Sequence, residues 1–127
     1  MKVGIDLVEL KRIKKLLKKN NLQNIFSQTE LENIQKSAHP IERAGGYFAV
    51  KEAVLKAFGL GLFNGLELNQ ICVEYLENGK PFIKQTPQIK TVMQNANVTQ
   101  IEISISHTEK SAIAICIVET YAVAHKL

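Results

Sequence analysis

Phe48 to Gly61, FAVKEAVLKAFGLG, is the stretch that decides the fold, and it predicts a buried helix. Alanine, leucine, lysine and glutamate are strong helix formers, and no proline interrupts them. Between positions 48 and 58 only Lys51, Glu52 and Lys56 are polar. A helix that is apolar around most of its circumference is usually buried. The two glycines at the end of the stretch predict where the helix stops, because glycine readily adopts the left-handed conformation that ends helices.

The charges on this helix allow two interpretations. Glu52 and Lys56 are four residues apart and share a face. They could form an ordinary surface ion pair, worth only ~0.3–0.5 kcal/mol. The apolar surroundings favour a functional site instead, because a buried charge without a partner is costly.

Composition narrows the class of protein. A chain of 127 residues is the size of one domain, and we expect residues 1–127 to form a single domain. No apolar run is long enough to span a bilayer. Asp6 lies where a signal peptide would need its apolar region, so we expect a cytoplasmic protein. Cys72 and Cys116 lie in apolar runs and are interpreted as small buried side chains.

The net charge of +4 comes from one segment. Residues 11–19 hold six lysines and arginines and no acid. Removing these six from the 16 basic residues leaves 10 against 12 acidic residues, a balance of −2. The segment predicts a basic helix from Leu10 to about Lys19, with an apolar stripe on its other face. Such a patch indicates an acidic partner: an acidic protein helix, phosphates or nucleic acid.

Helices and hairpin strands follow one another along the chain, which predicts an α+β fold. The expected strands are 3–8, 68–76, 81–84, 101–108 and 111–118, with a hairpin turn at 77–80. The expected helices, besides the basic one, begin at Thr29 as N-cap with Glu32 in a capping box, at Pro40, and at 86–87 with an end near Ala96.

Two strand residues do not fit a purely structural role. Asp6 is the only aspartate and lies inside a strand, where aspartate is disfavoured. Gly4 shares its face and leaves room for a close approach. His107 ends the apolar row of the strand 101–108. A turn or cap role for Asp6 and a packed core role for His107 remain alternatives to a functional one.

Four blocks of sequence resemble the holo-acyl-carrier-protein synthase family, the short, single-domain type of 4′-phosphopantetheinyl transferase. The blocks are GIDLVE at 4–9, FAVKEA with KAFG at 48–59, GKP at 79–81 and SISHT at 104–108. They occur in the family's order and cover nearly the whole chain.

The resemblance implies the 4′-phosphopantetheinyl transferase fold, in which an antiparallel sheet packs against a long central helix and three chains form a homotrimer. It also implies an activity in fatty acid biosynthesis. The enzyme transfers the 4′-phosphopantetheine arm of coenzyme A to a serine of apo-acyl carrier protein and releases adenosine 3′,5′-bisphosphate. Each coenzyme site would lie between neighbouring subunits.

The resemblance also implies roles for individual residues. Asp6 and Glu52 would bind Mg²⁺, with Mn²⁺ as an alternative, and Glu52, Lys56 and His107 would be catalytic. Lys56 and His107 would lie against the coenzyme's phosphates. The remaining coenzyme contacts would be Arg43, Gly59, Gly61, Lys80, Pro81 and Thr108. The basic helix would bind the acidic carrier protein through Lys11, Arg12, Lys15 and Lys18.

One position departs from the family pattern. The family commonly has Gly-Arg-Phe before its Lys-Glu pair, whereas this chain has Tyr47 in place of the arginine. A phosphate contact is therefore missing or supplied elsewhere. Arg43, one helical turn earlier, is the candidate.

Electrostatics supports a metal independently of the resemblance. Each unit charge on a carboxylate that faces a pyrophosphate charge at ~4 Å costs on the order of 4 kcal/mol at an effective dielectric constant of ~20. One lysine cannot offset several such terms, but a divalent cation can, and Mg²⁺ prefers oxygen ligands. We hypothesise that Glu52, through a water on the metal, accepts the serine proton.

Two other classes of function remain. A nucleic-acid-binding module would use the basic helix to follow phosphates, but it would not need Asp6, Glu52 or His107. Few aromatic residues are available for stacking on bases. A non-catalytic carrier-binding protein or trimeric scaffold is the second alternative.

Overall fold

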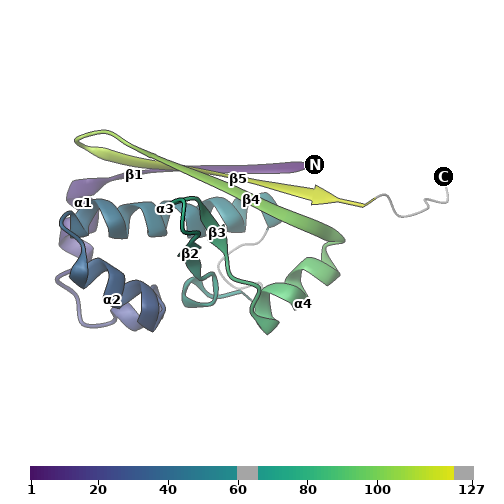
Figure 1. Ribbon diagram of the computed structural model, residues 1–127, viewed down its shortest axis with the longest axis horizontal. Coiled ribbons are helices and arrows are strands. Elements are labelled where there is room, and N and C mark those ends of the chain that lie inside the picture. The colour runs from purple at the N-terminus through teal and green to yellow at the C-terminus, as the bar shows by residue number, and fades with distance from the viewer. Residues whose placement is uncertain (60–65, 122–127) are drawn as a thin grey trace.

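A computed structural model describes residues 1–59 and 66–121, and it shows the expected α+β fold. A three-stranded antiparallel sheet forms one layer, and helices cover one of its faces (Figure 1). A two-stranded hairpin and a further helix complete the helical side. The elements are β1 (Lys2–Glu9), α1 (Leu10–Leu16), η1 (Leu22–Asn24), α2 (Gln28–Lys36), α3 (Pro40–Phe58), η2 (Leu68–Gln70), β2 (Val73–Tyr75), β3 (Pro81–Ile83), α4 (Pro87–Asn95), β4 (Val98–His107) and β5 (Ser111–Thr120).

The strand order β1-β5-β4 places the last strand in the middle of the sheet. Both pairings are antiparallel. The apolar residues on both faces of β5 predict a central strand, and the sheet confirms it. Alternate β5 residues are buried under the helices: Ala112, Ala114, Cys116 and Val118.

Helix α3 lies directly against β1 because Gly4 has no side chain. A Cβ atom at Gly4 would lie 1.9 Å from the carbonyl oxygen of Ala53 and 2.6 Å from the amide nitrogen of Ala57. The close approach that the sequence predicts at Gly4 is therefore made by the backbone of α3. This contact brings the next inward-facing residue of β1, Asp6, close to the last turns of the helix.

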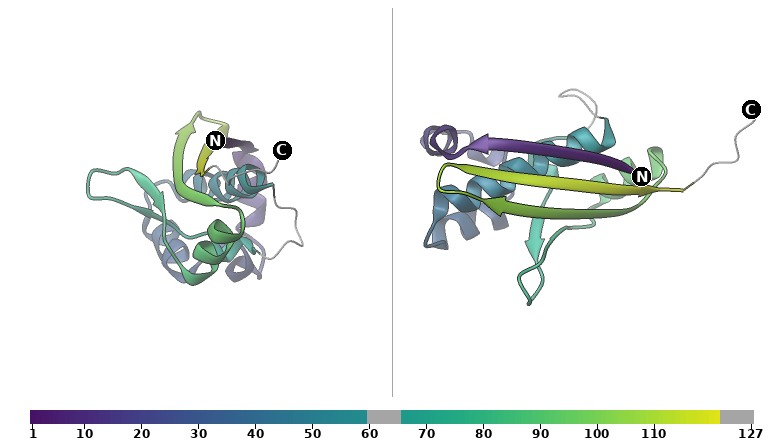
Figure 2. Two further views of the ribbon diagram at one scale, coloured as in Figure 1. Left: turned by 90° about the vertical axis from the view of Figure 1, so that its right-hand side faces the viewer. Right: turned by 90° about the horizontal axis from the view of Figure 1, so that it is seen from above.

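The other face of the sheet is apolar and uncovered. Val3, Ile5 and Leu7 are 54%, 54% and 64% exposed. Figure 2 (right) shows no helix in front of this face among the described residues. Each of the three β1 residues pairs with an isoleucine of β5, namely Ile117, Ile115 and Ile113. Six aliphatic side chains thus form one patch, which we call the open face.

Helix α3 begins and ends as its sequence predicts. Pro40 occupies its first turn, and Gly59 ends it with φ of 72° in the left-handed region. The other predicted glycine, Gly61, lies outside the described residues.

In residues 1–59 and 66–121, no helix has the length and apolar character that a membrane crossing requires.

Helix α1 is shorter than predicted, because it ends at Leu16 and not near Lys19. Its first turn contains no acidic residue, and lysines three and four residues apart repel one another along the helix. The helix predicted from Leu10 to about Lys19 is therefore about one turn too long.

The strand predicted over 68–76 is divided. Residues 68–70 form the turn η2, and only 73–75 pair as β2. Glu67 and Gln70 cap this turn reciprocally through their side chains and backbone amides. These backbone groups are committed to the turn and cannot join a strand ladder. The other predicted strands and α4 are present, and their ends differ from the predicted ones by at most three residues.

The capping box of α2 involves other residues than predicted. Ser27 is the N-cap and Glu30 its partner, in place of Thr29 and Glu32. The hydroxyl of Ser27 accepts from the Glu30 amide at 3.2 Å, and the Ser27 amide donates to the Glu30 carboxylate at 2.8 Å. Glu30 is selected because its carboxylate also meets Lys51 at 2.7 Å inside the core.

Candidate active site

Asp6, Glu52 and Lys56 come together where β1 passes the last turns of α3. The Lys56 ammonium donates to the Asp6 carboxylate at 3.0 Å and to the carbonyl oxygen of Ile5 at 3.1 Å. The Lys56 side chain is 55% exposed and that of Asp6 is 16% exposed. Glu52 lies one turn before Lys56 on the same helix and is half-buried. The site is therefore open to solvent on the lysine side and closed on the aspartate side.

The two carboxylates are close enough to repel each other. Burial raises the pKa of Glu52 above its usual value, and the negative charge of Asp6 raises it further. The positive charges of Lys56 and Arg12 act in the opposite direction but do not cancel the shift. The pair therefore holds an excess of negative charge that a cation would stabilise.

The donor set suits a hard divalent cation. In the part of the chain that the structure describes, no three or more histidine, cysteine, aspartate or glutamate side chains gather as a metal site. Within these described residues the site thus offers two carboxylates, from Asp6 and Glu52. Mg²⁺ usually takes one or two carboxylates and completes its shell with water and phosphate oxygens, so these residues fit it.

A second group of predicted residues lines a cavity of about 310 Å³ beside the first turns of α3. His107, Arg43 and Pro81 are among its lining residues, while Asp6, Glu52 and Lys56 are not. Its full lining is Ser37, His39, Glu42, Arg43, Gly46, Tyr75, Gly79, Pro81, Ile105 and His107.

His107 is held against the first turns of α3. Its Nε2 atom donates to the carbonyl oxygen of Glu42 at 3.0 Å. A carbonyl oxygen only accepts, so Nε2 carries the hydrogen and Nδ1 of the neutral ring is left as an acceptor. A Cβ atom at Gly46 would lie 3.3 Å from Nε2. Gly46 therefore provides the space in which the ring lies, a role that the sequence analysis missed.

Two predicted coenzyme contacts are occupied by other partners. Lys80 forms an exposed ion pair with Glu102 of β4 at 3.2 Å. The Thr108 hydroxyl accepts from the backbone amides of Lys110 and Ser111 in the β4–β5 turn. Neither residue is among those that line the cavity of His107.

One chain alone therefore presents two half-sites. Asp6 lies on β1 and His107 on β4, and β5 runs between these two edge strands. We call Asp6, Glu52 and Lys56 the carboxylate half-site. Arg43 and His107, with the cavity that they line, are the histidine half-site.

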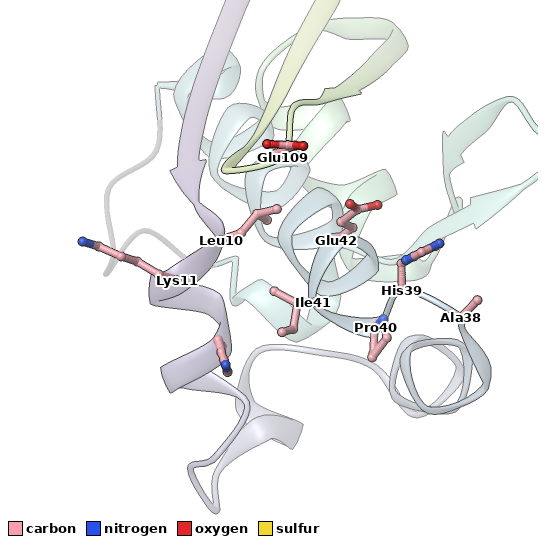
Figure 3. Close-up of a pocket in the computed structure, with 9 residues that line it drawn as sticks. Leu10, Lys11, Ala38, His39, Pro40, Ile41, Glu42 and Glu109 are labelled. Atoms are coloured by element: carbon pink, nitrogen blue, oxygen red, sulfur yellow. The ribbon is translucent and has the colours of Figure 1, made fainter.

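The basic residues of α1 and of the turn after it line two different hollows. Arg12, Lys15 and Lys19 surround a hollow of about 240 Å³ whose apolar lining includes Phe48 of α3. Lys11 is among the residues that line a different cavity of about 380 Å³ between α1, the start of α3 and the β4–β5 turn, and Figure 3 shows its side chain extending away from the other lining residues. Of the four predicted carrier contacts, Arg12 and Lys15 thus line the hollow beside Phe48, Lys11 is in the lining of the other cavity, and Lys18 is exposed beyond the helix end.

Tyr47, the residue in place of the family arginine, faces the core and not the site. It is fully buried, and its hydroxyl accepts from the side-chain amide of Asn33 at 3.3 Å. It cannot contact a ligand in the cavity. The sequence offered one unused signal nearby: Gly45 and Gly46 are adjacent in a helix interior, where glycine is disfavoured unless another group approaches closely.

Comparisons with known proteins show which family the chain resembles. The family model of the 4′-phosphopantetheinyl transferase superfamily matches residues 2–119. The chain is 38% identical over 120 residues to a holo-[acyl-carrier-protein] synthase of Fusobacterium nucleatum, covering 91% of this chain and 96% of that protein. It is 34% identical over 122 residues to one of Pseudoalteromonas atlantica, covering 94% and 97%.

Solved structures of the same name share the fold. The holo-[acyl-carrier-protein] synthase of Neisseria meningitidis matches with a TM-score of 0.86 at 27% identity, over 94% of this chain and 98% of that one. The Helicobacter pylori protein, solved in complex with coenzyme A, matches with a TM-score of 0.80 at 28% identity, over 92% and 99%. The fold expected from the four sequence blocks is confirmed, and the chain belongs to the holo-acyl-carrier-protein synthase family of the 4′-phosphopantetheinyl transferases.

Proposed function

We propose that this chain transfers the 4′-phosphopantetheine arm of coenzyme A to a serine of an apo-acyl carrier protein and releases adenosine 3′,5′-bisphosphate. Family membership supports this reaction. The observation that carries it is the carboxylate half-site, where two repelling carboxylates and a lysine are grouped at a solvent-open position. Such a group suits the handling of a pyrophosphate.

Asp6 and Glu52 are the residues that would hold Mg²⁺ or Mn²⁺. When bound, the ion supplies charge stabilisation for the phosphoryl group and for the leaving bisphosphate. Lys56 is exposed and reaches Asp6 over a single helical turn from Glu52. Its ammonium can exchange the Asp6 oxygen for a phosphate oxygen at little cost, because a half-exposed ion pair contributes only ~0–1 kcal/mol. His107 offers its free Nδ1 to the ligand from the other half-site.

The two half-sites would be completed by neighbouring copies in a homotrimer. The open face of six aliphatic residues supports this proposal, since a contiguous exposed apolar patch usually marks an interface. The separation of Asp6 from His107 across β5 gives the interface a function. The carboxylate half-site of one subunit would face the histidine half-site of the next.

The reaction is tested by incubating the chain with coenzyme A, Mg²⁺ and an apo carrier, and measuring the carrier's mass. We expect a gain equal to one phosphopantetheine arm on the serine. Glu52→Gln should reduce the rate at least about a hundredfold, because it removes a charge from the metal's ligand set. Glu77→Gln, in the exposed hairpin turn, is the matched control and should retain activity. Unchanged transfer by Glu52→Gln would exclude Glu52 as ligand and as base.

The shared site is tested by mixing two inactive variants, Asp6→Asn and His107→Ala. If each site takes one half from each of two subunits, random trimers restore both wild-type halves in about a quarter of the sites. Activity should therefore reappear on mixing and subunit exchange. A mixture that stays inactive although mass measurements show exchanged trimers would contradict shared sites.

Docking of the carrier is proposed at the hollow beside Phe48, because its rim of Arg12, Lys15 and Lys19 adjoins the carboxylate half-site. Acyl carrier proteins are acidic, so these charges would steer their approach. Arg12→Glu should raise the KM for the carrier about tenfold or more and leave coenzyme A binding unchanged. Lys11→Glu, at a residue that does not line this hollow, is the control and should have a smaller effect. Equal effects would show that the carrier contact extends beyond the hollow.

The cytoplasmic location stays a prediction. The nucleic-acid-binding alternative predicts tight, salt-dependent binding to DNA or RNA and no mass change of the carrier. The carrier-binding scaffold alternative predicts a complex with the carrier and, again, no mass change. The transfer assay therefore separates the three classes.

A further inference from the structure

The guanidinium group of Arg43 lies over the ring of Tyr75, and the proposed reaction does not account for this contact. Its guanidinium carbon lies 4.8 Å from the centroid of the Tyr75 ring. Tyr75 in turn packs on Tyr47 at 6.3 Å, and Tyr47 packs on Phe26 at 6.5 Å. The outermost ring is thus backed by two rings of the core, and α3 presents Arg43 to its exposed side.

The guanidinium has no acidic partner in residues 1–59 and 66–121. Lysines form the four ion pairs found in these ranges, and no hydrogen bond of the Arg43 side chain occurs there. Contact with a ring face uses the flat surface of the guanidinium and leaves its N–H edges free. A half-buried arginine with free donors and a restricted orientation is suited to bind an oxyanion in a bidentate manner.

Arg43 lines two adjoining cavities. One is the cavity of about 310 Å³ that contains His107. The other, of about 700 Å³, lies between α2 and the β2–β3 hairpin and shares Ser37, Arg43, Tyr75 and Gly79 with the first. Arg43 and Tyr75 therefore lie at the junction of the two cavities, within reach of a ligand that occupies either.

The charges around this junction favour a phosphate. The smaller cavity adds His39 as a further donor and Glu42 as its one acid. The larger cavity adds Lys36 and also Glu74, and Glu74 already faces Lys84 at 3.8 Å. A phosphate monoester, with up to two negative charges and three acceptor oxygens, can use both a guanidinium edge and neighbouring donors.

We propose that Tyr75 is a positioning residue that orients Arg43, and that Arg43 so oriented binds the 3′-phosphate monoester of coenzyme A. This inference rests on the proposed function. Coenzyme A carries a pyrophosphate, which reacts and belongs at the carboxylate half-site, and one further phosphate at the 3′ position. The histidine half-site, supplied by the neighbouring subunit, is the one left for that phosphate. Arg43 and the ring beneath it then select the phosphorylated coenzyme over its dephosphorylated form.

The experiment measures equilibrium binding by calorimetry, using the full chain with coenzyme A and with 3′-dephospho-coenzyme A. The wild type should bind coenzyme A more tightly. Arg43→Met should weaken coenzyme A binding on the order of tenfold to a hundredfold, and change the affinity for 3′-dephospho-coenzyme A less than about twofold. A misfolded variant would lose both ligands, so the second ligand controls for folding.

Tyr75 is tested by a conservative pair and a double variant. Tyr75→Leu should weaken coenzyme A binding roughly threefold to tenfold, whereas Tyr75→Phe keeps the ring and should stay within about twofold. In the Arg43→Met background, Tyr75→Leu should have no further effect, because Tyr75 acts through Arg43. A purely structural role of Tyr75 would weaken both ligands equally in every background.

The outcomes separate this inference from the proposed function. If the wild type prefers coenzyme A but Arg43→Met binds both ligands as the wild type does, Arg43 does not bind the 3′-phosphate and the inference is wrong. Additive effects of Tyr75→Leu and Arg43→Met would exclude the positioning role. If both ligands bind as expected but no carrier gains mass, the transfer function fails while the phosphate contact stands. If the wild type binds neither ligand, both are overturned.

Discussion

Two lysine–carboxylate pairs lie five residues apart on α3 and have opposite consequences. Lys51 and Glu30 are both fully buried, and Lys51 also donates to the carbonyl oxygens of Leu68 and Ile71. Lys56 is 55% exposed and meets Asp6, close to a second carboxylate, Glu52. The first pair is complete, because each donor of the ammonium has an acceptor. The second keeps an excess of negative charge and access to solvent.

Only the exposed pair of Lys56 and Asp6 can bind a ligand without a large loss of stability. Burial lowers the pKa of Lys51, and the charge and hydrogen bond of Glu30 oppose that shift. A ligand that entered this pair would leave a buried charge without a partner, which is costly. At the second pair a cation or a phosphate can replace one contact by another. The buried pair of Lys51 and Glu30 contributes to stability, whereas the exposed group of Lys56, Asp6 and Glu52 is available to a ligand.

The largest expected effect comes from breaking the buried pair. Lys51→Met should lower the free energy of unfolding by about 3–5 kcal/mol, because it leaves the Glu30 carboxylate buried without its cation. Denaturant unfolding followed by circular dichroism measures the change. Lys56→Met is the matched control and should change the free energy by less than about 1 kcal/mol. If the two lysines contribute equally, the distinction between the pairs does not hold.

A smaller effect is expected from separating β1 from α3. Gly4→Ala should cost about 1–3 kcal/mol of stability, because its Cβ would overlap backbone atoms of Ala53 and Ala57 that cannot move independently. It should also reduce transfer, since Asp6 would move away from Glu52. Thermal unfolding and the transfer assay measure both.

Gly45→Ala is the control for this change. Its Cβ would meet the flexible end of Leu10 at 2.7 Å, and alanine favours the helix. We expect a change of less than about 1 kcal/mol and near-normal transfer. A Gly45→Ala variant as impaired as Gly4→Ala would show that close packing of α3 in general, and not the β1 contact, is the determinant.

The smallest effect is expected on the melting temperature, from removing the repulsion between Glu52 and Asp6. The folded pKa of Glu52 lies above its ordinary value of 4.5, so ionised Glu52 opposes folding in the absence of a divalent cation. This cost is absent below pH 4.5 and grows as the pH rises through the folded pKa. Glu52→Gln should therefore raise the melting temperature in a chelating buffer by roughly 1–3 °C at pH 8.

At pH 4.5 the same substitution should change the melting temperature less. A variant that is less stable than the wild type at pH 8 in the chelator would contradict the repulsion between Asp6 and Glu52. Together with the loss of transfer in this variant, the expected result would show a carboxylate that is retained for function at the expense of stability.

Much of the fold followed from local sequence. The end of α3 at Gly59, the first turn at Pro40 and the central position of β5 were all predicted, because each depends on backbone preferences or on which faces are apolar. The four-residue spacing of Glu52 and Lys56 on one helix face was likewise available. The family blocks then placed Asp6 beside them.

Long-range partners were not predictable in the same way. The choice of Glu30 over Glu32 in the capping box depends on Lys51, which is 21 residues away. The division of the strand predicted over 68–76 depends on the same lysine, which takes two of the carbonyl groups there. The burial of Tyr47, in place of the family arginine, depends on the rings of Phe26 and Tyr75.

The sequence by itself determined most of the helices and strands, the family and the identity of the two carboxylates, because these depend on local periodicity and on residue types in order along the chain. Only the tertiary structure decided which lysine is buried, that His107 and Asp6 lie at opposite edges of the sheet, and that six aliphatic side chains remain uncovered. The physical reason is that burial and pairing energies arise between residues distant in sequence, and a one-dimensional pattern does not contain those distances.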